Sequence, residues 1–304
     1  MRVERKLAWI YEPDIMATSM KTTLVWLSRI AAALAIIIVL VLAGVYAASE
    51  YIRVRTYQAP PAPLKIAATP ELIQAGARRA RVFGCTACHG EDLRGKLFSD
   101  EPYFATSYAA NVTLSARSYT DEQLAQLFRH GIKRDGKAIY AMPSSMYHYW
   151  TDEELASLIA YVRSLSAGGV EQPAPRIGPL LRLAVVRGDI RPEVHWIAQS
   201  RTRSAAVLGP EHAAGRHIAI TVCTECHETD LTGIGRNPDL RIVAAYDLVQ
   251  FRHLMRTGKA LGNRELGQMS ETARARFSHL TDDEVASLHS YLTARAMLPI
   301  EKPQ

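Results

Sequence analysis

The five-residue unit Cys-x-x-Cys-His occurs twice in this chain and constrains its fold more than any other feature. The copies read CTACH at 85–89 and CTECH at 223–227. Together they contain all four cysteines of the 304-residue sequence, so none remains for a structural disulfide. On a helical turn the first and fourth residues share a face and the fifth lies beside them. The spacing therefore directs two thiols and one imidazole towards a common site.

Several chemistries use closely spaced cysteines, and the repeated histidine discriminates between them. A zinc ribbon places its two cysteine pairs about 15–20 residues apart, whereas Cys88 and Cys223 are far apart in the sequence. A thioredoxin-like dithiol needs a βαβ context that is absent from the pattern. A disulfide suits an exported chain but explains neither the histidine nor its repetition. Thioether attachment of haem explains all these features. The sequence therefore predicts two covalently bound haem c groups, held by Cys85, Cys88 and His89 and by Cys223, Cys226 and His227.

The segments around the two units are also duplicated. Residues 75–95 match 213–233, residues 128–143 match 254–270, and residues 151–165 match 281–295. A period of this length is that of a domain rather than of a solenoid repeat. We therefore expect two tandem domains, at 71–167 and 211–298, joined by a linker at 168–210.

Helical patterns dominate both copies. Residues 155, 158, 159, 162 and 165 form an apolar stripe at helical spacing. Thr151 with Glu154 and Thr281 with Glu284 form capping boxes at equivalent places, and Thr120 with Gln123 marks a further helix start. Convincing alternating strands are not found. The expected fold class is all-α, with a transmembrane helix before two helical domains that each enclose an apolar cofactor.

The stretch Ile30–Ala48 carries no charge and would span about 28 Å as a helix. It predicts a transmembrane anchor at 22–48, after a cytoplasmic N-terminus at 1–21 and before a Pro-rich linker at 49–70. The alternatives are a buried core helix and a signal peptide cleaved near 45–47. Five basic residues precede the segment and three follow it closely, which favours export of the remainder. With a net charge of only +6 and no dense basic run, nucleic-acid binding is not expected.

The second axial ligand of each iron comes from a set of methionines and histidines. In the first domain the candidates are Met142, Met146, His130 and His148; in the second they are Met255, Met269, His253 and His279. Met142 follows Gly131 by eleven residues, and Met269 follows Gly258 by the same eleven. This repeated spacing favours Met142 and Met269 as iron ligands over core packing. His148 and His279 also occupy similar places and remain the alternative. The stretch SETARARF follows Met269 without a counterpart, so its loop is expected to differ.

Over about residues 22–297 the chain resembles membrane-anchored dihaem cytochromes c of Gram-negative bacteria, which contain two class I cytochrome c domains. The motifs that carry the resemblance are CTACHG, CTECH, AMPSSMYHYWTDEELASLIAYVRSL and LGQMSETARARFSHLTDDEVASLHSYL, together with SYAANVTLS. The resemblance implies Met142 and Met269 as distal ligands and places Asn111 near a haem edge. It also implies a periplasmic electron carrier on the inner membrane. Such a carrier takes electrons from a dehydrogenase or quinol-oxidising complex and delivers them to a terminal oxidase.

Two other functions stay open at this point: a peroxidase-like dihaem enzyme, and a fixed cytochrome subunit of a membrane dehydrogenase or oxidase complex. The pattern provides no catalytic residues. The apolar linker stretch at 180–190 could dock a partner or the membrane, although packing between the two domains is favoured. Three arginines before the first motif could bind haem propionates, form a docking face or lie in solvent: Arg78, Arg79 and Arg81. Three histidines are interpreted as structural: His195, His212 and His217.

Overall fold

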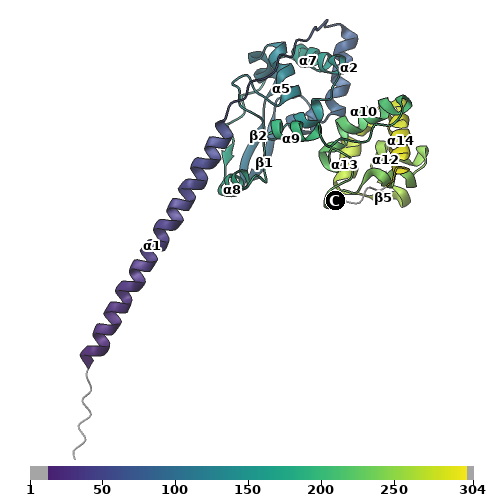
Figure 1. The fold of residues 1–304 in the computed structure, drawn as a ribbon. Coiled ribbons are helices and arrows are strands. Elements are labelled where there is room, and N and C mark those ends of the chain that lie inside the picture. The colour runs from purple at the N-terminus through teal and green to yellow at the C-terminus, as the bar shows by residue number, and fades with distance from the viewer. Residues whose placement is uncertain (1–12, 300–304) are drawn as a thin grey trace, which may run out of the picture.

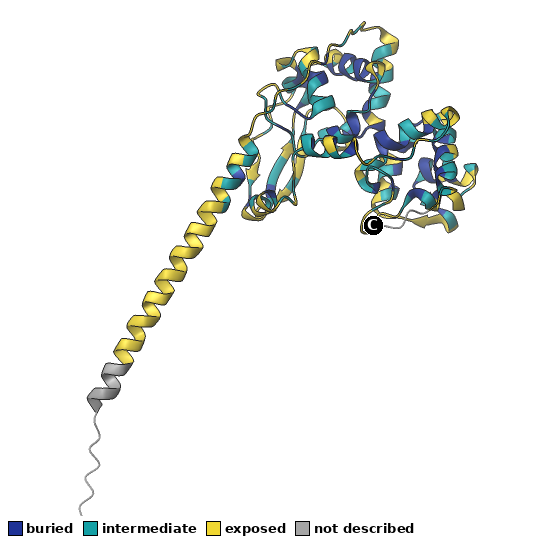
Figure 2. Ribbon diagram, viewed as in Figure 1, coloured by how far each residue is buried: buried dark blue, intermediate teal, exposed yellow. Residues whose placement is uncertain are grey.

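A single long helix protrudes from two packed helical domains in the computed structural model, which describes residues 13–299 (Figure 1). This helix, α1, spans Pro13–Val54, and from Met20 onward its apolar side chains are exposed until it reaches the first domain (Figure 2). By length and composition, the Met20–Val54 stretch is the one helix of the described chain that could cross a membrane. The helix thus extends beyond the predicted anchor and includes the first residues of the predicted Pro-rich linker.

Domain 1 is organised around two helices that cross at a glycine. Its α-helices are α2 (Pro70–Val82), α3 (Cys85–His89), α4 (Val112–Ser115), α5 (Asp121–His130), α6 (Ser144–Tyr147) and α7 (Asp152–Ser164). A Cβ atom at Gly76 of α2 would lie 2.0 Å from the carbonyl oxygen of Ser157 on α7. Because only glycine permits this approach, α2 and α7 pack backbone to backbone. This crossing fixes the start of α3, which follows α2 directly.

Domain 2 repeats the same crossing. Its α-helices are α10 (Ala213–Val222), α11 (Thr224–His227), α12 (Leu248–Thr257), α13 (Gln268–Ala275) and α14 (Asp282–Ala296), with 3-10 turns η3 (Leu240–Ala245) and η5 (Phe277–His279). A Cβ atom at Gly215 of α10 would lie 2.0 Å from the carbonyl oxygen of Ser287 on α14. The internal duplication read from the sequence is therefore a duplication of packing geometry.

Capping boxes begin the helices at the predicted places. In α5, α7 and α14 the N-cap threonine accepts from the backbone N–H three residues on, and the Gln or Glu side chain at that position accepts from the threonine N–H. A fourth box, at Asp247 and Gln250, begins α12. Each box satisfies two backbone donors that the first helical turn would otherwise leave unpaired. The local sequence therefore determines where these helices begin.

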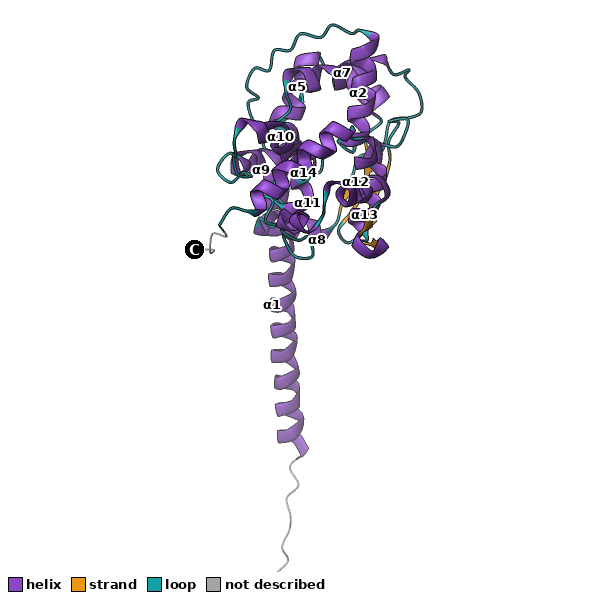
Figure 3. Cartoon of the chain, turned by 90° about the vertical axis from the view of Figure 1, so that its right-hand side faces the viewer, coloured by secondary structure: helices purple, strands orange, loops and turns teal. Residues whose placement is uncertain are grey.

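Short antiparallel strands, which the pattern did not predict, accompany the helices (Figure 3). Strands β1 (Lys96–Glu101), β2 (Ala105–Ala109) and β3 (Arg176–Ile177) form one sheet in that order, with Lys96 opposite Ala109 and Glu101 opposite Ala105. Strands β4 (Lys259–Ala260) and β5 (Arg264–Glu265) form a two-residue pair. Strand β1 is largely exposed and so lacks the apolar alternation that reveals a strand in sequence. Helices still dominate, and the all-α class is confirmed.

The segments between α1 and α2 and between the two domains lie against domain 1. Residues 56–69 are largely without regular structure, and the N–H of Tyr57 donates to the carbonyl of Gly136 at 2.8 Å. The second connection contains α8 (Pro179–Arg187) and α9 (Glu193–Ser200). Helix α9 packs on α6, where the Glu193 carboxylate accepts from the Ser145 N–H at 2.7 Å. Helix α8 packs on α1. The favoured expectation that residues 180–190 pack between the domains is therefore wrong.

Candidate functional site

The two Cys-x-x-Cys-His motifs adopt the same local backbone. In both, a short helical turn ends at the histidine, and a glycine N–H six residues later donates to the histidine carbonyl: Gly95 to His89 at 2.7 Å and Gly233 to His227 at 3.0 Å. Within each loop a buried leucine, Leu93 or Leu231, has a positive φ of 57° or 65°. Leucine rarely adopts this conformation. Its recurrence shows that the surrounding packing defines the loop in both domains.

The motif histidines are each held by one ring nitrogen. Nδ1 of His89 donates to the carbonyl of Ala110, and Nδ1 of His227 donates to that of Pro238, both at 2.8 Å. Burial lowers the pKa of both imidazoles, which favours their neutral form. Neither Nε2 atom has a hydrogen-bond partner among residues 13–299. A neutral imidazole oriented through Nδ1 and free at Nε2 fits an axial ligand of haem iron.

The motif cysteines are four unpaired thiols, two in each domain. Burial raises the pKa of Cys85 and of Cys223 to about 12, and it also raises the pKa of Cys88 and of Cys226. These thiols are therefore protonated at neutral pH and are not disulfide-bonded. Two free thiols beside one oriented imidazole, repeated in both domains, fit the donor set that covalent haem attachment requires.

The candidate distal methionines are half-buried at the edge of the core. Met142 lies two residues before α6, whereas Met269 lies inside the first turn of α13, and both contact the hydrophobic core. The inserted stretch after Met269 therefore forms most of α13, which is longer than the α6 that follows Met142 in domain 1. Met146 and Met255 are 1% and 3% exposed and are part of the core itself. The assignment of Met142 and Met269 as ligands stays a prediction.

The histidine alternatives to these methionines have other contacts. Nε2 of His148 lies 2.7 Å from Oγ of Ser200, and burial, with the charge of Arg201, lowers the pKa of His148 to about 4. The carbonyl of His279 accepts from Arg78 at 3.2 Å. His148 thus belongs to the contact between α6 and α9, and His279 lies at the contact between the domains.

Arg276 lies between the two motifs and was not singled out in the sequence. Its side chain extends from the end of α13 into domain 1, where Nε donates to the Val82 carbonyl at 3.1 Å and a Cβ at Gly84 would lie 2.9 Å from Nε. Nη1 donates to the Glu225 carboxylate, inside the second motif, at 2.9 Å. The residue is only 9% exposed. One guanidinium therefore contacts the residue that precedes Cys85 and a residue between Cys223 and Cys226.

The charge of Arg276 extends to all four motif cysteines. It lowers the pKa of each thiol, in opposition to the larger effect of burial. Its Nη2 atom is buried and has no hydrogen-bond partner within the described chain. This orphaned donor, together with the two free imidazole Nε2 atoms, fits a cofactor that supplies additional acceptors and ligands. Met146 lies as far before the capping Thr151 as Arg276 lies before the capping Thr281. Because domain 1 has a methionine at this position, the repeat itself did not predict an arginine.

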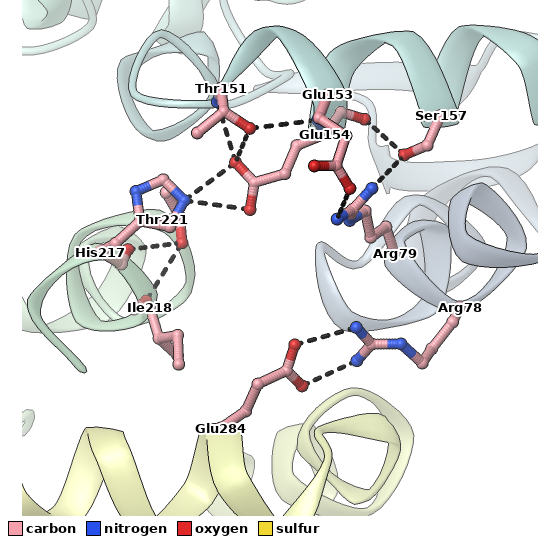
Figure 4. A network of polar contacts seen from close by, with 10 residues as sticks. All are labelled: Arg78, Arg79, Thr151, Glu153, Glu154, Ser157, His217, Ile218, Thr221 and Glu284. Carbon is pink, nitrogen blue, oxygen red and sulfur yellow. Dashed lines mark hydrogen bonds and ion pairs between the residues drawn. The ribbon is translucent and has the colours of Figure 1, made fainter. Parts of the chain in front are cut away.

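Two polar pairs, related by the internal repeat, join the domains (Figure 4). Arg78 of α2 donates to both carboxylate oxygens of Glu284 on α14, at 2.7 and 2.9 Å. His217 of α10 lies 2.9 and 3.0 Å from the carboxylate oxygens of Glu154 on α7. Arg78 and His217 each follow a crossing glycine by two residues, and both glutamates belong to capping boxes. The same surface of each domain therefore contacts its counterpart, as in a two-fold dimer.

These contacts settle the roles of several residues that the sequence left open. Arg78 and His217 lie in the domain interface; a structural role was expected for His217, and its specific partner could not be read from the sequence. Arg79 donates to Oγ of Ser157 at 2.7 Å, and Arg81 forms an exposed ion pair with Glu91. Both therefore support α2 locally.

Asn111 anchors the loop that holds the first motif histidine. The side chain is fully buried, and its Nδ2 donates to the carbonyls of Gly168 and Val170 at 2.8 and 3.1 Å. Its neighbour Ala110 supplies the carbonyl that accepts from His89. Asn111 therefore positions the acceptor that orients His89, and its expected place near a haem edge stays a prediction.

The repeated site geometry coincides with matches to one known family. The family model for cytochrome c matches residues 73–166 and, separately, residues 212–295. The chain belongs to the cytochrome c family. Each match includes one complete Cys-x-x-Cys-His motif and the helix crossing that supports it. The chain therefore consists of tandem cytochrome c domains behind an apolar N-terminal helix, and it carries haem c in each.

Several curated relatives are cytochrome subunits of dehydrogenases. The chain is 26% identical over 275 residues to the fructose dehydrogenase cytochrome subunit of Gluconobacter japonicus, a match that covers 77% of this chain and 54% of that protein. It is 35% identical over 109 residues to the cytochrome c subunit of quinone alcohol dehydrogenase from Gluconacetobacter polyoxogenes, covering 32% and 23% of the two chains. The corresponding subunit of Gluconobacter oxydans is 28% identical over 170 residues, covering 51% and 35%. The matches thus span about half of these relatives or less.

Proposed function

We propose that this chain transfers single electrons as the cytochrome subunit of a membrane dehydrogenase complex, with one haem c in each domain. The observation that carries the proposal is the contact of Arg276 with the second motif and with the residues just before the first, because it brings the two sites together at the domain interface. The dehydrogenase as partner is supported by the printed names of the relatives. A terminal oxidase as final acceptor is implied by the sequence resemblance.

The motif residues hold the cofactor in this proposal. Cys85 and Cys88 would form the thioethers in domain 1, and His89 through Nε2 and Met142 through its sulfur would hold the iron. Cys223, Cys226, His227 and Met269 would do the same in domain 2. Haem iron supplies reversible uptake of one electron. With both a methionine and a histidine holding each iron, no position would remain for a substrate, which suits a carrier rather than an enzyme.

The domain interface gives the two sites a fixed separation. Arg78 with Glu284 and His217 with Glu154 lie at related positions and resist rotation of one domain on the other. Arg276 adds a buried contact next to both motifs. A fixed arrangement of this kind favours electron transfer within the chain, because neither domain has to move before an electron passes between the two sites.

The membrane topology belongs to the same proposal. We infer that α1 anchors the chain in the bacterial inner membrane with both haem domains in the periplasm, where c-type cytochromes and an oxidising compartment are expected. The excess of basic residues before the apolar stretch supports this orientation.

The relatives give no indication of peroxidase-like activity.

Purification from native membranes in mild detergent tests the proposed function. We expect a dehydrogenase subunit to copurify, both irons to be low-spin, and substrate of that dehydrogenase to reduce both haems. Isolation of the chain alone, with high-spin ferric iron and rapid peroxide turnover, would contradict the carrier role. Isolation alone with low-spin iron would retain the carrier role and reject the fixed complex.

A further inference from the structure

Helix α8 is attached to the end of the apolar helix α1. The Arg182 guanidinium lies 3.9 Å from the ring centroid of Tyr46, and its Nη1 donates to Oγ of Ser49 at 2.9 Å and to the Glu50 carboxylate at 3.1 Å. Ser49 is fully buried by this contact. Helix α8 is therefore held at a defined height along α1.

That height coincides with the end of the uncharged part of α1. Between Arg29 and Glu50 the helix carries no charged residue, a length of about 30 Å, which matches a hydrocarbon core. Tyr46 lies about 6 Å before Glu50 along the helix axis. Arg182 thus contacts α1 within about one helical turn of the expected boundary between the hydrocarbon core and the lipid headgroups.

An exposed apolar face of α8 lies at the same end of domain 1. Leu180, Leu183 and Val186, spaced by three residues, are 55%, 41% and 38% exposed. The β1–β2 turn adds Tyr103, which is 76% exposed and accepts through its carbonyl from the N–H of Leu180 at 3.0 Å. These four residues form the juxtamembrane patch. Figures 1 and 2 show α8 and the hairpin beside the point where α1 leaves the domain.

We propose that the juxtamembrane patch rests in the boundary between lipid headgroups and acyl chains of the membrane that holds α1. The proposal rests on α1 spanning that membrane. Lipid must cover the exposed apolar surface of α1, and the patch continues this surface outward across α8. Aromatic and aliphatic side chains beside arginine are typical of interfacial contacts, with the guanidinium reaching the headgroup phosphates. Arg187, exposed at the end of α8, lies at this level, where its guanidinium also pairs with the Asp189 carboxylate at 3.1 Å.

The contact would orient the haem domains relative to the bilayer. One helix alone permits rotation and tilt of whatever it carries, whereas α1 and the patch together form two separate contacts. Because domain 2 is fixed to domain 1 by the paired interface, its position above the membrane would follow. The contact would therefore determine from which side a donor or acceptor in the same membrane can approach the haem domains.

Photocrosslinking of the full chain in lipid nanodiscs tests this placement. Benzoylphenylalanine replaces Tyr103 or, separately, Leu183, and the discs contain phosphatidylglycerol and phosphatidylethanolamine and no other membrane protein. The matched control carries it at Val249 on α12 of domain 2, which is 73% exposed. After irradiation, mass spectrometry measures the fraction of chain that gains a phospholipid.

We expect a several-fold higher lipid yield at Tyr103 and Leu183 than at Val249. Yields equal to the control at both positions would overturn the proposal. So would the absence of lipid adducts combined with crosslinking to a dehydrogenase subunit in native membranes, because a protein would then cover the patch. If the Leu183 variant fails to mature, the exposed Tyr103 position alone decides the result. The electron-transfer role is unaffected by either outcome.

Discussion

Replacing Arg276 by methionine should lower the reduction potentials of both haems. A nearby positive charge stabilises the reduced iron, so its removal favours the oxidised state. The guanidinium contacts the second motif and the residues just before the first, and the residue is only 9% exposed, so solvent screens its charge weakly. Methionine is the residue at the equivalent position of domain 1, Met146, which makes the exchange compatible with the fold.

The magnitude follows from Coulomb's law. If the charge acts over about 10 Å at an effective dielectric constant of about 20, it contributes about 1.7 kcal/mol. For a one-electron couple, 59 mV corresponds to about 1.4 kcal/mol, so the upper bound is about 70 mV. Water that enters the vacated space increases screening. We therefore expect each midpoint to fall by roughly 20–60 mV.

An optical redox titration of the purified protein, resolved into two one-electron midpoints, measures this effect. Arg274→Met is the matched control, because it removes the same charge from the same helix but at a side chain that is 44% exposed. Its shift should be several times smaller owing to screening by solvent and salt. A shift of only one midpoint for Arg276→Met, or equal shifts for both variants, would refute the placement of this charge between the haems.

Three further changes test other parts of the account. Met142→Ala should open the iron of domain 1, producing high-spin ferric absorption and a lower potential for that haem; an unchanged spectrum would reject the ligand assignment. Glu154→Gln keeps the capping box but weakens the contact with His217, and should reduce domain docking by about 1 kcal/mol, measured by hydrogen exchange of α10. Burial raises the pKa of Glu154, but the hydrogen bond and charge of His217 outweigh this and hold the pKa below its usual value. The contribution of this carboxylate is therefore complete above about pH 4.5 and is lost as the pH falls through its folded-state pKa; docking that strengthens as the pH falls through this acid range would be inconsistent with this sign. Gly76→Ala should destabilise domain 1 by at least about 2 kcal/mol, because the new Cβ would lie 2.0 Å from a carbonyl oxygen of α7, whereas Gly44→Ala, with nothing within 4 Å, should leave thermal unfolding of the domain unchanged.

Features set by local chemistry could be predicted from the sequence. The capping boxes at Thr151 and Thr281 lie where the pattern placed them, because a cap depends only on residues three positions apart. The motifs adopt helical turns for the same reason. The duplication also predicted two equivalent domains, which the paired helix crossings at Gly76 and Gly215 bear out in the packing.

Features that depend on contacts between distant segments could not be predicted. Arg276 lies in the stretch inserted after Met269, its counterpart counted back from the capping threonine is a methionine, and only the folded chain places it beside Val82. His217 gives no sequence signal for its contact with Glu154 on the other domain. Helix α8 has an apolar face, but periodicity indicates that something covers such a face without identifying it.

Mass analysis of the two motif peptides tests the central claim most directly. After expression with an active c-type maturation system, the chain is digested and the peptides containing residues 85–89 and 223–227 are weighed. The account predicts that each peptide carries one covalently bound haem, with no free thiol at any of the four cysteines. A peptide at its bare amino-acid mass, or two peptides joined by a disulfide, would contradict the claim that each domain holds its own haem.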